Sequence, residues 1–575
     1  MAGLDPAYLR EQIVGVDSTF ETPFGERLMV YCDYTASGRC LRFVEAYLQG
    51  LQRIYANTHT EDDITGRSMS QLLHEAEASI KRSVNAGDEG CIIACGTGAT
   101  GAIDKLQQIV GVAIAPATRK LLYDLVDSAG AGLDRRGFHE LLAATQPVVF
   151  VGPYEHHSNE ISWRQSLATT IEVRLDEAGG VDLAHLEELL TDPRYRGRLR
   201  IGSFSAASNV TGMRTDVRKI ASLLHAHDAL ACFDYAACAP YVEIDMNPEP
   251  DGPGDDPSID AIFISPHKFL GGPGASGVLV FNQRIYHREL PPSVSAGGTV
   301  DYVVVSGEDF ITNIEDREKP GTPGVLQTLK AALVFQIKDR VGFATIETRE
   351  HALTSRAMRS WAGNDAIEIL GNPEPSSRVG IISFNIRGTD GRYLHHKFVT
   401  ALLNDLFGIQ SRAGCSCAGP YGHQLLNIDE DRAEQYRSAV RSGYCGIKPG
   451  WCRIGLHWVM DDAEADYVID AVHFVARHGH RFLELYDFDV CTGTWRHRQS
   501  TTELPDFSLD AALAYAQGEP ALLPPPLRQQ LYDHYMTEAH RWLDRLGTGS
   551  SSTSLGGDLD DLQFFSLPGE PAPRH

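Results

Sequence analysis

The sequence lacks the cysteine patterns that stabilise secreted proteins or bind structural zinc. Its 11 cysteines are an odd number, spread over 575 residues without a CxxC pair. A disulfide framework needs paired cysteines, and a zinc site needs closely spaced cysteines or histidines. We therefore predict no metal site and expect most of the cysteines to be buried small apolar residues.

The sequence also lacks an excess of positive charge and any long apolar run. The formal net charge is -25, whereas binding to nucleic acid or to an anionic membrane needs a basic face. No apolar stretch is long enough to span a bilayer, and residues 1–6 have neither the basic start nor the apolar core of a signal peptide. We therefore expect a cytoplasmic protein that binds no nucleic acid and no membrane, and whose ligands are small.

Apolar strand-like runs alternate with amphipathic helical stretches from about residue 70 to residue 290. This alternation predicts an α/β fold with a large, mostly parallel sheet that helices cover. The expected strands are residues 91–94, 148–151, 200–204, 230–233, 261–264 and 277–281. Ligands collect at the carboxyl ends of the strands in such sheets, so we expect the functional residues there.

The length of the chain predicts two or three domains, because 575 residues are too many for one compact core. Residues 327–360 read as a long helical connection to a smaller α/β domain. The expected limits are 1–30 for an N-terminal part of the small domain, 31–326 for the large domain, 327–483 for the small domain and 484–575 for a C-terminal extension. The Gly/Ser/Pro-rich acidic end predicts disorder from about residue 546.

Lys268 lies in the run SPHKFLGGPG, between the last two expected strands of the large domain. A lysine at a strand end beside glycines has little room to extend into solvent, and its neutral amine can attack an aldehyde. Lys268 is therefore a candidate Schiff-base residue, which would make the protein a pyridoxal-phosphate enzyme. A surface lysine in a loop is the alternative interpretation.

A glycine-rich loop, residues 96–101, follows the first expected strand and precedes a helix. Its backbone amides can bind a phosphate at the N-terminus of that helix. The loop also spells GxGxxG, but the acidic residue of a dinucleotide site should end a second strand about twenty residues on, and residues 118–124 read as helix. The loop therefore predicts phosphate binding, with a dinucleotide site and a structural turn as alternatives.

Three polar residues follow other expected strands. His156, in the run YEHHSNE, could stack on an aromatic cofactor and act as an acid/base group, although adjacent histidines are also common on solvated loops. Asp234 could keep a pyridine nitrogen protonated, and the amide of Asn209 could bond a ring hydroxyl. A helix cap and a turn residue are the alternatives for these two. The chain order of phosphate loop, His156, Asn209, Asp234 and Lys268 favours a common site.

With these motifs, the chain resembles the class V aminotransferase-fold enzymes that use pyridoxal phosphate, and most closely the cysteine desulfurases of the SufS and molybdenum-cofactor sulfurase type. The similarity runs from about residue 31 to about residue 483. The resemblance implies a fold-type I transferase, a homodimer, bound pyridoxal phosphate, a small amino-acid substrate and a sulfur-acceptor protein as partner.

The resemblance also assigns roles to residues of the large domain. It implies that Lys268 carries the cofactor, that His267, Ser265, Ala99 and Thr100 contact its phosphate, that His156 rather than His157 stacks on its ring, that Asp234 meets the pyridine nitrogen, and that Asn209 contacts the ring hydroxyl and the substrate. The run SAGGTV resembles the segment that crosses to the phosphate of the other subunit. This likeness implicates Thr299.

Two further family motifs lie nearer the C-terminus. The run RAGCSCA resembles R-x-G-x-x-C-A, which implies Cys417 as the nucleophile; a thiolate can attack the sulfur of a bound cysteine and keep it as a persulfide. The run WCRIGLH resembles the strand whose arginine binds the substrate's α-carboxylate, which implies Arg453. A buried thiol and an exposed ion-pair partner are the alternatives. Cys415 has no counterpart and could be a resolving or a bystander thiol.

The chain departs from the family pattern in four places. The D-x-A-Q motif ends in Ala237, so a glutamine that contacts the cofactor's ring oxygen is missing, and Thr60 stands where the N-x-H-R motif has arginine. Residues 424–448 form an insertion, and the extension after residue 483 has no counterpart. These departures bear on substrate and reaction more than on fold and cofactor.

The sequence as a whole predicts a pyridoxal-phosphate enzyme, a cysteine desulfurase that releases alanine from L-cysteine with a persulfide on Cys417. Lys268, Cys417 and His156 are the expected catalytic residues, and Asn209 and Arg453 the expected substrate contacts. Another reaction on the same fold, by an aminotransferase, a β-lyase or an epimerase, is the alternative, because none of these needs Cys417. A binding protein that keeps the fold without catalysis is a third hypothesis.

Overall fold

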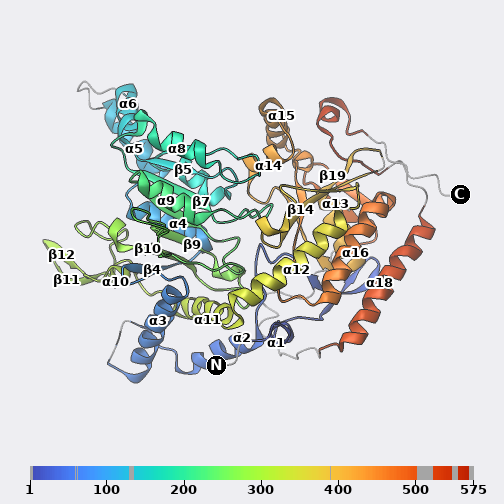
Figure 1. Ribbon diagram of the computed structural model, residues 1–575, viewed down its shortest axis with the longest axis horizontal. Helices are drawn as coiled ribbons and strands as arrows, with labels where there is room; N and C mark the ends of the chain where they lie inside the picture. Colours follow the sequence, from blue (N-terminus) through green and yellow to red (C-terminus); the bar gives the residue numbers. More distant parts are fainter. Residues whose placement is uncertain are drawn as a thin grey trace. The chain divides into compact units, whose positions relative to one another are not determined.

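The computed structural model describes residues 4–58, 60, 62–128, 135–388, 390–500, 522–546 and 554–568 (Figure 1). The chain divides into two compact units. The first unit comprises Met1–Leu4, Thr35–Thr348 and Ser377–Val379, and the second unit comprises Asp5–Tyr34, Arg349–Ser376 and Gly380–His575.

A seven-stranded sheet forms the centre of the first unit. Its strands are, from one edge to the other, β4 (Gly90–Cys95), β10 (Gly277–Asn282), β9 (Ala261–Ile264), β8 (Leu230–Asp234), β7 (Arg200–Ser205), β5 (Val148–Val151) and β6 (Thr169–Glu172). Strand β10 is antiparallel to both of its neighbours, and all other pairs are parallel. The sheet confirms the predicted α/β fold and the six expected strands. It adds β6, which the sequence analysis did not predict.

Continuous apolar runs explain why these strands lie at the centre. All residues of β5 and β9 are buried, as expected of parallel strands that are covered on both faces. The helices of this unit are α2 (Arg42–Leu51), α3 (Ile64–Ser83), α4 (Gly98–Ile109), α5 (Pro116–Ser128), α6 (Arg135–Thr145), α7 (Ile161–Arg164), α8 (Leu183–Thr191), α9 (Val217–Ala226), α10 (Ile314–Arg317) and α11 (Val325–Val341). Helix α4 packs against β10, and α11 packs against α3.

A hairpin of β11 (Val300–Val304) and β12 (Gly307–Phe310) projects from the first unit, as Figure 1 shows. The predicted helical connection is present as two helices, α11 and α12 (Phe343–Trp361), which Gly342 separates with φ +87°. Helix α12 begins in the first unit and ends in the second.

A five-stranded antiparallel sheet forms the second unit together with its helices. Strands β13 (Ile367–Ile369), β14 (Ile381–Arg387), β18 (Trp451–Gly455) and β17 (Arg412–Gly414) follow one another, and β15 (Tyr393–Leu394) also pairs with β14. The smaller strands are β1 (Thr19–Thr22), β2 (Gly25–Leu28), β3 (Val30–Tyr31), β16 (Ile409–Gln410), β19 (Tyr486–Asp489) and β20 (Thr494–His497). The helices are α1 (Pro6–Glu11), α13 (His396–Phe407), α14 (Gly419–Leu425), α15 (Glu430–Arg441), α16 (Asp462–His478) and α18 (Pro525–Arg545).

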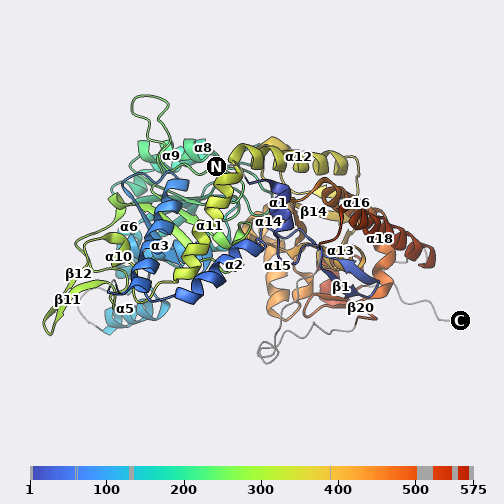
Figure 2. The same ribbon diagram turned by 90° about the horizontal axis from the view of Figure 1, so that it is seen from below.

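Part of the C-terminal extension belongs to the core of the second unit. Helix α18 lies beside α16 (Figure 2), and the rings of Tyr467 and Tyr532 stack at 4.3 Å. Phe565 is fully buried and its backbone pairs with Tyr393. The prediction of disorder beyond residue 546 is therefore wrong for residues 554–568. The Gly/Ser run on which it depended, residues 547–553, lies outside the described residues.

None of the helices in the described ranges combines the length and the apolar character that a membrane span requires.

Candidate active site

The turn that carries Lys268 packs closely against the backbone of Gly38. It is a 3-10 helix, Pro266–Lys268, between β9 and β10. The amide of Gly38 donates to the carbonyl of His267 at 2.9 Å, and a Cβ on Gly38 would overlap the carbonyl of Phe269. Substitution of Gly38 would therefore displace the turn, and the half-buried Lys268 has a fixed backbone from which to act.

The same turn packs against the N-terminus of α4, the expected phosphate loop. The amide of Ala99 donates to Ser265 Oγ at 2.9 Å. Gly98 has φ +64°, and a Cβ there would lie 2.8 Å from both His267 Cε1 and Ser265 Oγ. Thr97 caps the helix without a side-chain hydrogen bond, so first-turn amides other than that of Ala99 suit an anion. The residues present fit the phosphate of pyridoxal phosphate.

His267 is neutral at physiological pH. Burial, and then the nearby charge of Lys268, lower its pKa to about 4. A neutral imidazole can donate a hydrogen bond to a phosphate oxygen without adding a charge of its own. The structure therefore brings together the predicted phosphate contacts Ser265, His267 and Ala99.

Asp234 ends β8 and is 5% exposed. Its Oδ1 accepts a hydrogen bond from the amide of Ala236 at 2.8 Å. Burial raises the pKa of the carboxyl, while that amide and the charge of Lys268 lower it. Within the described part of the chain no ion pair forms on Asp234. Because an ionised buried carboxylate needs a cationic partner, the group suits the protonated nitrogen of a pyridine ring.

His156 is fixed by a short hydrogen-bonded chain to the phosphate loop. Its Nδ1 accepts a hydrogen bond from the amide of Ser158 at 3.1 Å, and Ser158 Oγ lies 2.7 Å from Thr100 Oγ1. The acceptor role of Nδ1 assigns the proton of the neutral ring to Nε2. Thr100 thus joins the site through its hydroxyl as well as through its position in α4.

The sequence analysis missed Glu155, which anchors the loop of His156. Its Oε1 accepts from the amide of Ser205 at 2.7 Å, and its Oε2 accepts from Ser205 Oγ at 2.6 Å and from Asn159 Nδ2 at 2.7 Å. Burial raises the pKa of Glu155 to about 7, against those hydrogen bonds. The glutamate directly before His156 in the run YEHHSNE was the signal that could have identified Glu155 from the sequence. Ser205 also lies opposite Asp234 in the β7–β8 register, so the network reaches the strand of Asp234.

Asn209 and Thr299 are both buried residues of the first unit. Asn209 is buried in the turn after β7, within the first unit that holds Lys268 and Asp234. Thr299 is fully buried, and its hydroxyl donates to the carbonyl of Ala296 at 2.7 Å. The predicted contact of Thr299 with the phosphate of a second subunit stays a prediction.

Arg453 lies in the second unit, on the central strand β18, and is 4% exposed. Its Nη2 is 3.1 Å from Asp33 Oδ1, while Asp33 Oδ2 is 3.3 Å from Nη1 of Arg412. Arg453 is therefore buried, unlike the exposed ion-pair partner that was its alternative. Sequence analysis did not find Asp33, because it lies 420 residues from Arg453 in the chain.

Cys417 is exposed, in a strained loop between β17 and α14. Ser416 and Cys417 have φ of +50° and +56°, a left-handed conformation that is uncommon for residues other than glycine. Trp451 Nε1 donates to Ser416 Oγ at 3.2 Å, and the amide of Ala418 donates to the carbonyl of Cys415. The buried-thiol alternative for Cys417 is wrong. Six of the eleven cysteines are buried, as expected.

The structure describes both residues at which the chain departs from a family motif, Ala237 and Thr60. Ala237 is buried, at 7% exposed, and has only a methyl group where the family motif has glutamine. Thr60 is described, whereas His59 of the same motif lies outside the described residues. No group of three His, Cys, Asp or Glu side chains that could hold a metal ion occurs within the described ranges.

Comparison with known proteins agrees with this arrangement. The model of the family described as aminotransferase class-V matches residues 139–468. A protein of Halalkalibacterium halodurans named probable cysteine desulfurase is 24% identical over 327 residues, which are 56% of this chain and 74% of that protein. One from Mycobacterium leprae, probable cysteine desulfurase 2, is 28% identical over 273 residues, 48% of this chain and 60% of its own.

A solved structure shows the same fold. The apo structure of the cysteine desulfurase from Thermococcus onnurineus superposes with a TM-score of 0.62 at 19% identity, and the match covers 83% of this chain and 100% of that one. Enzymes of this family depend on pyridoxal phosphate, for which the first unit has fitting residues. Because the family model matches more than half of the chain, the protein belongs to the class V aminotransferase family of pyridoxal-phosphate enzymes.

Proposed function

We propose that this protein is a cysteine desulfurase, which takes the sulfur of L-cysteine onto Cys417 and releases alanine. The observation that carries the proposal is Cys417 itself, an exposed thiol in a left-handed loop at the family's nucleophile position. Strained residues of this kind persist where the surroundings over-determine them, often at functional sites. The relatives named probable cysteine desulfurase support the same reaction.

The first unit supplies the proposed cofactor contacts. Lys268 would hold pyridoxal phosphate, with Asp234 at the ring nitrogen and Asn209 at the ring hydroxyl. Ala99, Thr100, Ser265 and His267 would bind the phosphate at the start of α4. When bound, pyridoxal phosphate withdraws electrons from the Cα atom of an amino acid.

Proton transfer falls to Lys268 and His156. The amine of Lys268, once released, can take the proton from the substrate's Cα and return one to the product. His156 has its Nε2 proton available, because Nδ1 accepts the amide of Ser158. We propose that it stacks on the ring and acts as an acid/base group while Cys417 attacks the sulfur of the substrate.

Cys417 performs the sulfur step. Its thiolate attacks the sulfur of L-cysteine, so that an S–S bond forms and the Cβ–S bond of the substrate breaks. The carbon gains a proton and leaves as alanine, and Cys417 keeps the sulfur as a persulfide. One thiol and one cysteine therefore become one persulfide and one alanine, without an external oxidant.

Arg453 is the proposed partner of the substrate's α-carboxylate. Its guanidinium has five donors in a fixed fork, and Asp33 engages Nη2. Asp33 thereby compensates the charge of a guanidinium that is 4% exposed. We propose that the ion pair also orients the fork, so that the substrate meets a positioned pair of donors.

We also propose that the enzyme is a cytoplasmic homodimer that passes sulfur to an acceptor protein. The tip of the β11–β12 hairpin exposes a run of apolar side chains, Tyr302, Val303, Val304 and Val305. Exposed apolar patches mark interaction surfaces, and a second copy of the chain would cover this one. The exposure of Cys417 suits a thiol that hands its sulfur to another protein.

Product analysis tests the proposal. The purified, cofactor-loaded protein is incubated with each of the common amino acids and a small thiol as sulfur acceptor. We expect alanine and sulfide in equal amounts from L-cysteine. A keto acid would indicate an aminotransferase, pyruvate with ammonia a β-lyase, and inversion at Cα an epimerase. A protein that binds no pyridoxal phosphate and forms no product would be a binding protein.

A further inference from the structure

Two exposed cysteines of the second unit lie side by side, away from the loop of Cys417. Cys445 begins a 3-10 helix, Cys445–Ile447, in the insertion of residues 424–448. Cys491 lies in the turn between β19 and β20, in the C-terminal extension. Both thiols are exposed, and the proposed desulfurase chemistry uses neither. Both segments are also departures from the family pattern.

Direct backbone hydrogen bonds join the two segments. The amide of Cys445 donates to the carbonyl of Cys491 at 3.2 Å, and the amide of Gly446 donates to the carbonyl of Val490 at 2.7 Å. The approach requires glycine: a Cβ on Gly446 would lie 2.8 Å from the carbonyl oxygen of Val490, and one on Gly493 would lie 3.0 Å from the Cα of Gly446. The two backbones therefore run in contact at the cysteines.

Each segment is also held from outside the contact. Asp489 Oδ1 accepts from the amide of Cys491 at 2.8 Å, which fixes the turn. Helix α13 supplies the other two anchors: Lys397 Nζ donates to the carbonyl of Thr492 at 3.2 Å, and buried His395 Nε2 lies 2.9 Å from the carbonyl of Gly446. The relative position of Cys445 and Cys491 is thus set by helix α13 as well as by their own hydrogen bonds.

The geometry suits a disulfide. The hydrogen bond of 3.2 Å between the amide of Cys445 and the carbonyl of Cys491, together with standard backbone dimensions, keeps the two Cα atoms within about 7 Å of each other. Disulfides form at Cα separations of about 4.4–6.8 Å, so the two backbones are already near the distance that the bond needs. Exposure lets a dissolved oxidant reach both sulfurs.

We infer that Cys445 and Cys491 are a redox modification site, which closes to a disulfide by exchange with a small disulfide such as oxidised glutathione. The thiolate of one cysteine attacks the small disulfide and releases one small thiol. The second cysteine then attacks the mixed disulfide and releases the other. Two protein thiols are oxidised, one small disulfide is reduced to two thiols, and these carry the two protons. In a reducing compartment Cys445 and Cys491 remain two free thiols until the pool of small thiols becomes oxidised.

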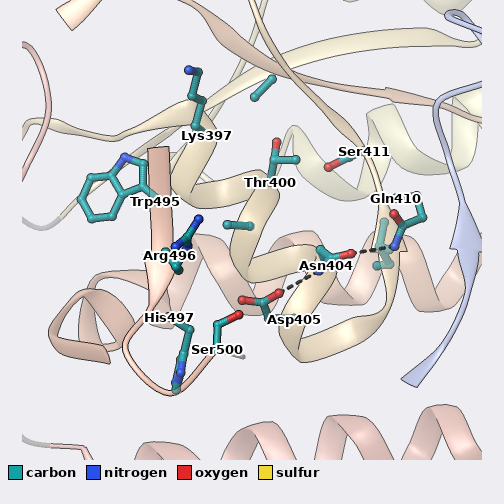
Figure 3. A pocket seen from close by; sticks show the side chains of 13 residues that line it. Lys397, Thr400, Asn404, Asp405, Gln410, Ser411, Trp495, Arg496, His497 and Ser500 are labelled. Carbon is teal, nitrogen blue, oxygen red and sulfur yellow. Dashed lines mark hydrogen bonds between the residues drawn. The ribbon is translucent and has the colours of Figure 1, made fainter. Parts of the chain in front are cut away.

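The bond would tie the insertion to the hairpin of β19 and β20. Trp495, Arg496 and His497 of that hairpin line a pocket of about 420 Å³. Figure 3 shows Lys397 and Arg496 among the residues around it. Ser411 and Ala413 also line the pocket, and in the chain they come just before Cys415 and Cys417. The disulfide would therefore restrain part of the lining of a pocket that the segment before the proposed nucleophile also lines.

The test uses the full chain with Cys415→Ser and Cys417→Ser, so that the thiols of the other loop cannot react. The protein is incubated with oxidised glutathione, alkylated, and mapped by mass spectrometry without reduction. We expect the loss of two alkylatable thiols, a cross-linked peptide pair containing Cys445 and Cys491, and a melting temperature several degrees above that of the reduced protein. Adding Cys445→Ser or Cys491→Ser should abolish the cross-link and the shift in melting temperature.

Three outcomes would overturn the inference. The first is a glutathione adduct on each cysteine without a cross-link, and the second is a disulfide between two chains, visible as a dimer on a non-reducing gel. The third is an unchanged number of free thiols in protein that circular dichroism shows to be folded. Because the pair is read out by mass and not by catalysis, none of these results depends on the desulfurase proposal.

Discussion

Asp33 contacts the buried Arg453 at 3.1 Å and in doing so occupies one donor of its guanidinium fork. A carboxylate of the protein thus occupies the kind of position that a substrate carboxylate would take. The pair compensates the charge of Arg453, but it also leaves the substrate fewer donors. Arg453 therefore binds Asp33 in addition to its proposed task of binding the substrate.

Arg453→Lys tests this double task. A lysine is a single point charge and cannot serve two carboxylates in a fixed geometry. We expect the KM for L-cysteine to rise about 10- to 100-fold, the value of one or two charge-assisted hydrogen bonds, with a smaller change in kcat. The matched control is Arg412→Lys, because Arg412 contacts the same Asp33 but is exposed. An equal rise in KM in both variants would show that the effect comes from a lost contact with Asp33 and not from a lost contact with the substrate.

Lys268→Ala tests the cofactor attachment. The purified protein should absorb visible light, because a lysine bonded to pyridoxal phosphate conjugates with its ring. We expect the variant to lose this absorbance and its activity, while circular dichroism stays unchanged. Lys219→Ala is the control, because Lys219 is an exposed lysine of the same unit that pairs with Asp216. Unchanged visible absorbance in Lys268→Ala would rule out Lys268 as the attachment point.

Glu155 predicts a pH-dependent stability. Burial raises its pKa to about 7 in the folded protein, against 4.5 ordinarily. Between these values the folded protein holds a proton that the unfolded chain releases, so the free energy of unfolding falls as pH rises through that window, by about 3 kcal/mol at most. Below pH 4.5 Glu155 adds no pH dependence to the free energy of unfolding. Above pH 7 its full contribution to that free energy has been lost.

Glu155→Gln should flatten this dependence, because an amide does not ionise. The melting temperature of the variant should be lower at pH 5, since Asn159 loses an acceptor, and should change less between pH 5 and pH 8. Glu177→Gln is the control, an exposed glutamate of the same unit. An equal pH slope in wild type and Glu155→Gln would show that other groups carry the dependence.

The sequence predicted those parts of the fold and site that local patterns determine. Strands such as β5 and β9 are apolar throughout and could be recognised by themselves. Strand β6, TTIE, is only partly buried and lacks that signal. Lys268 and Asp234 were candidates because Asp234 ends one buried strand and Lys268 lies in the turn after another.

Contacts between distant segments could not be predicted in this way. Asp33 meets Arg453 across 420 residues. Cys445 meets Cys491 through backbone hydrogen bonds between distant segments, which contacts from Lys397 and His395 also hold. Residues 554–568 also depend on contacts with a distant segment for their structure. Phe565 is buried, and its backbone pairs with Tyr393, far earlier in the chain. Composition predicts disorder for that segment, and its tertiary contacts override the composition.

Cys417→Ser separates desulfuration from the other reactions of the family. Serine keeps the size of the side chain, but its hydroxyl is not ionised at neutral pH and cannot hold a transferable sulfur. We expect alanine release from L-cysteine to fall by roughly three orders of magnitude or more, as when other catalytic nucleophiles are removed. Binding of pyridoxal phosphate should persist, because its proposed contacts lie in the first unit. Visible absorbance before and after addition of L-cysteine measures that binding.

Cys415→Ser is the matched control for this experiment. Cys415 lies two residues away in the same loop, and its carbonyl accepts the amide of Ala418 whichever side chain it carries. Its substitution should therefore leave the loop intact and reduce alanine release much less. Labelling of the protein with L-[35S]cysteine gives a second readout, since wild type and Cys415→Ser should retain sulfur that a small thiol removes, whereas Cys417→Ser should retain none. Continued alanine release by Cys417→Ser, or equal losses in both variants, would show that the sulfur does not pass through Cys417, and the reaction would then belong to the lyases or aminotransferases of this fold.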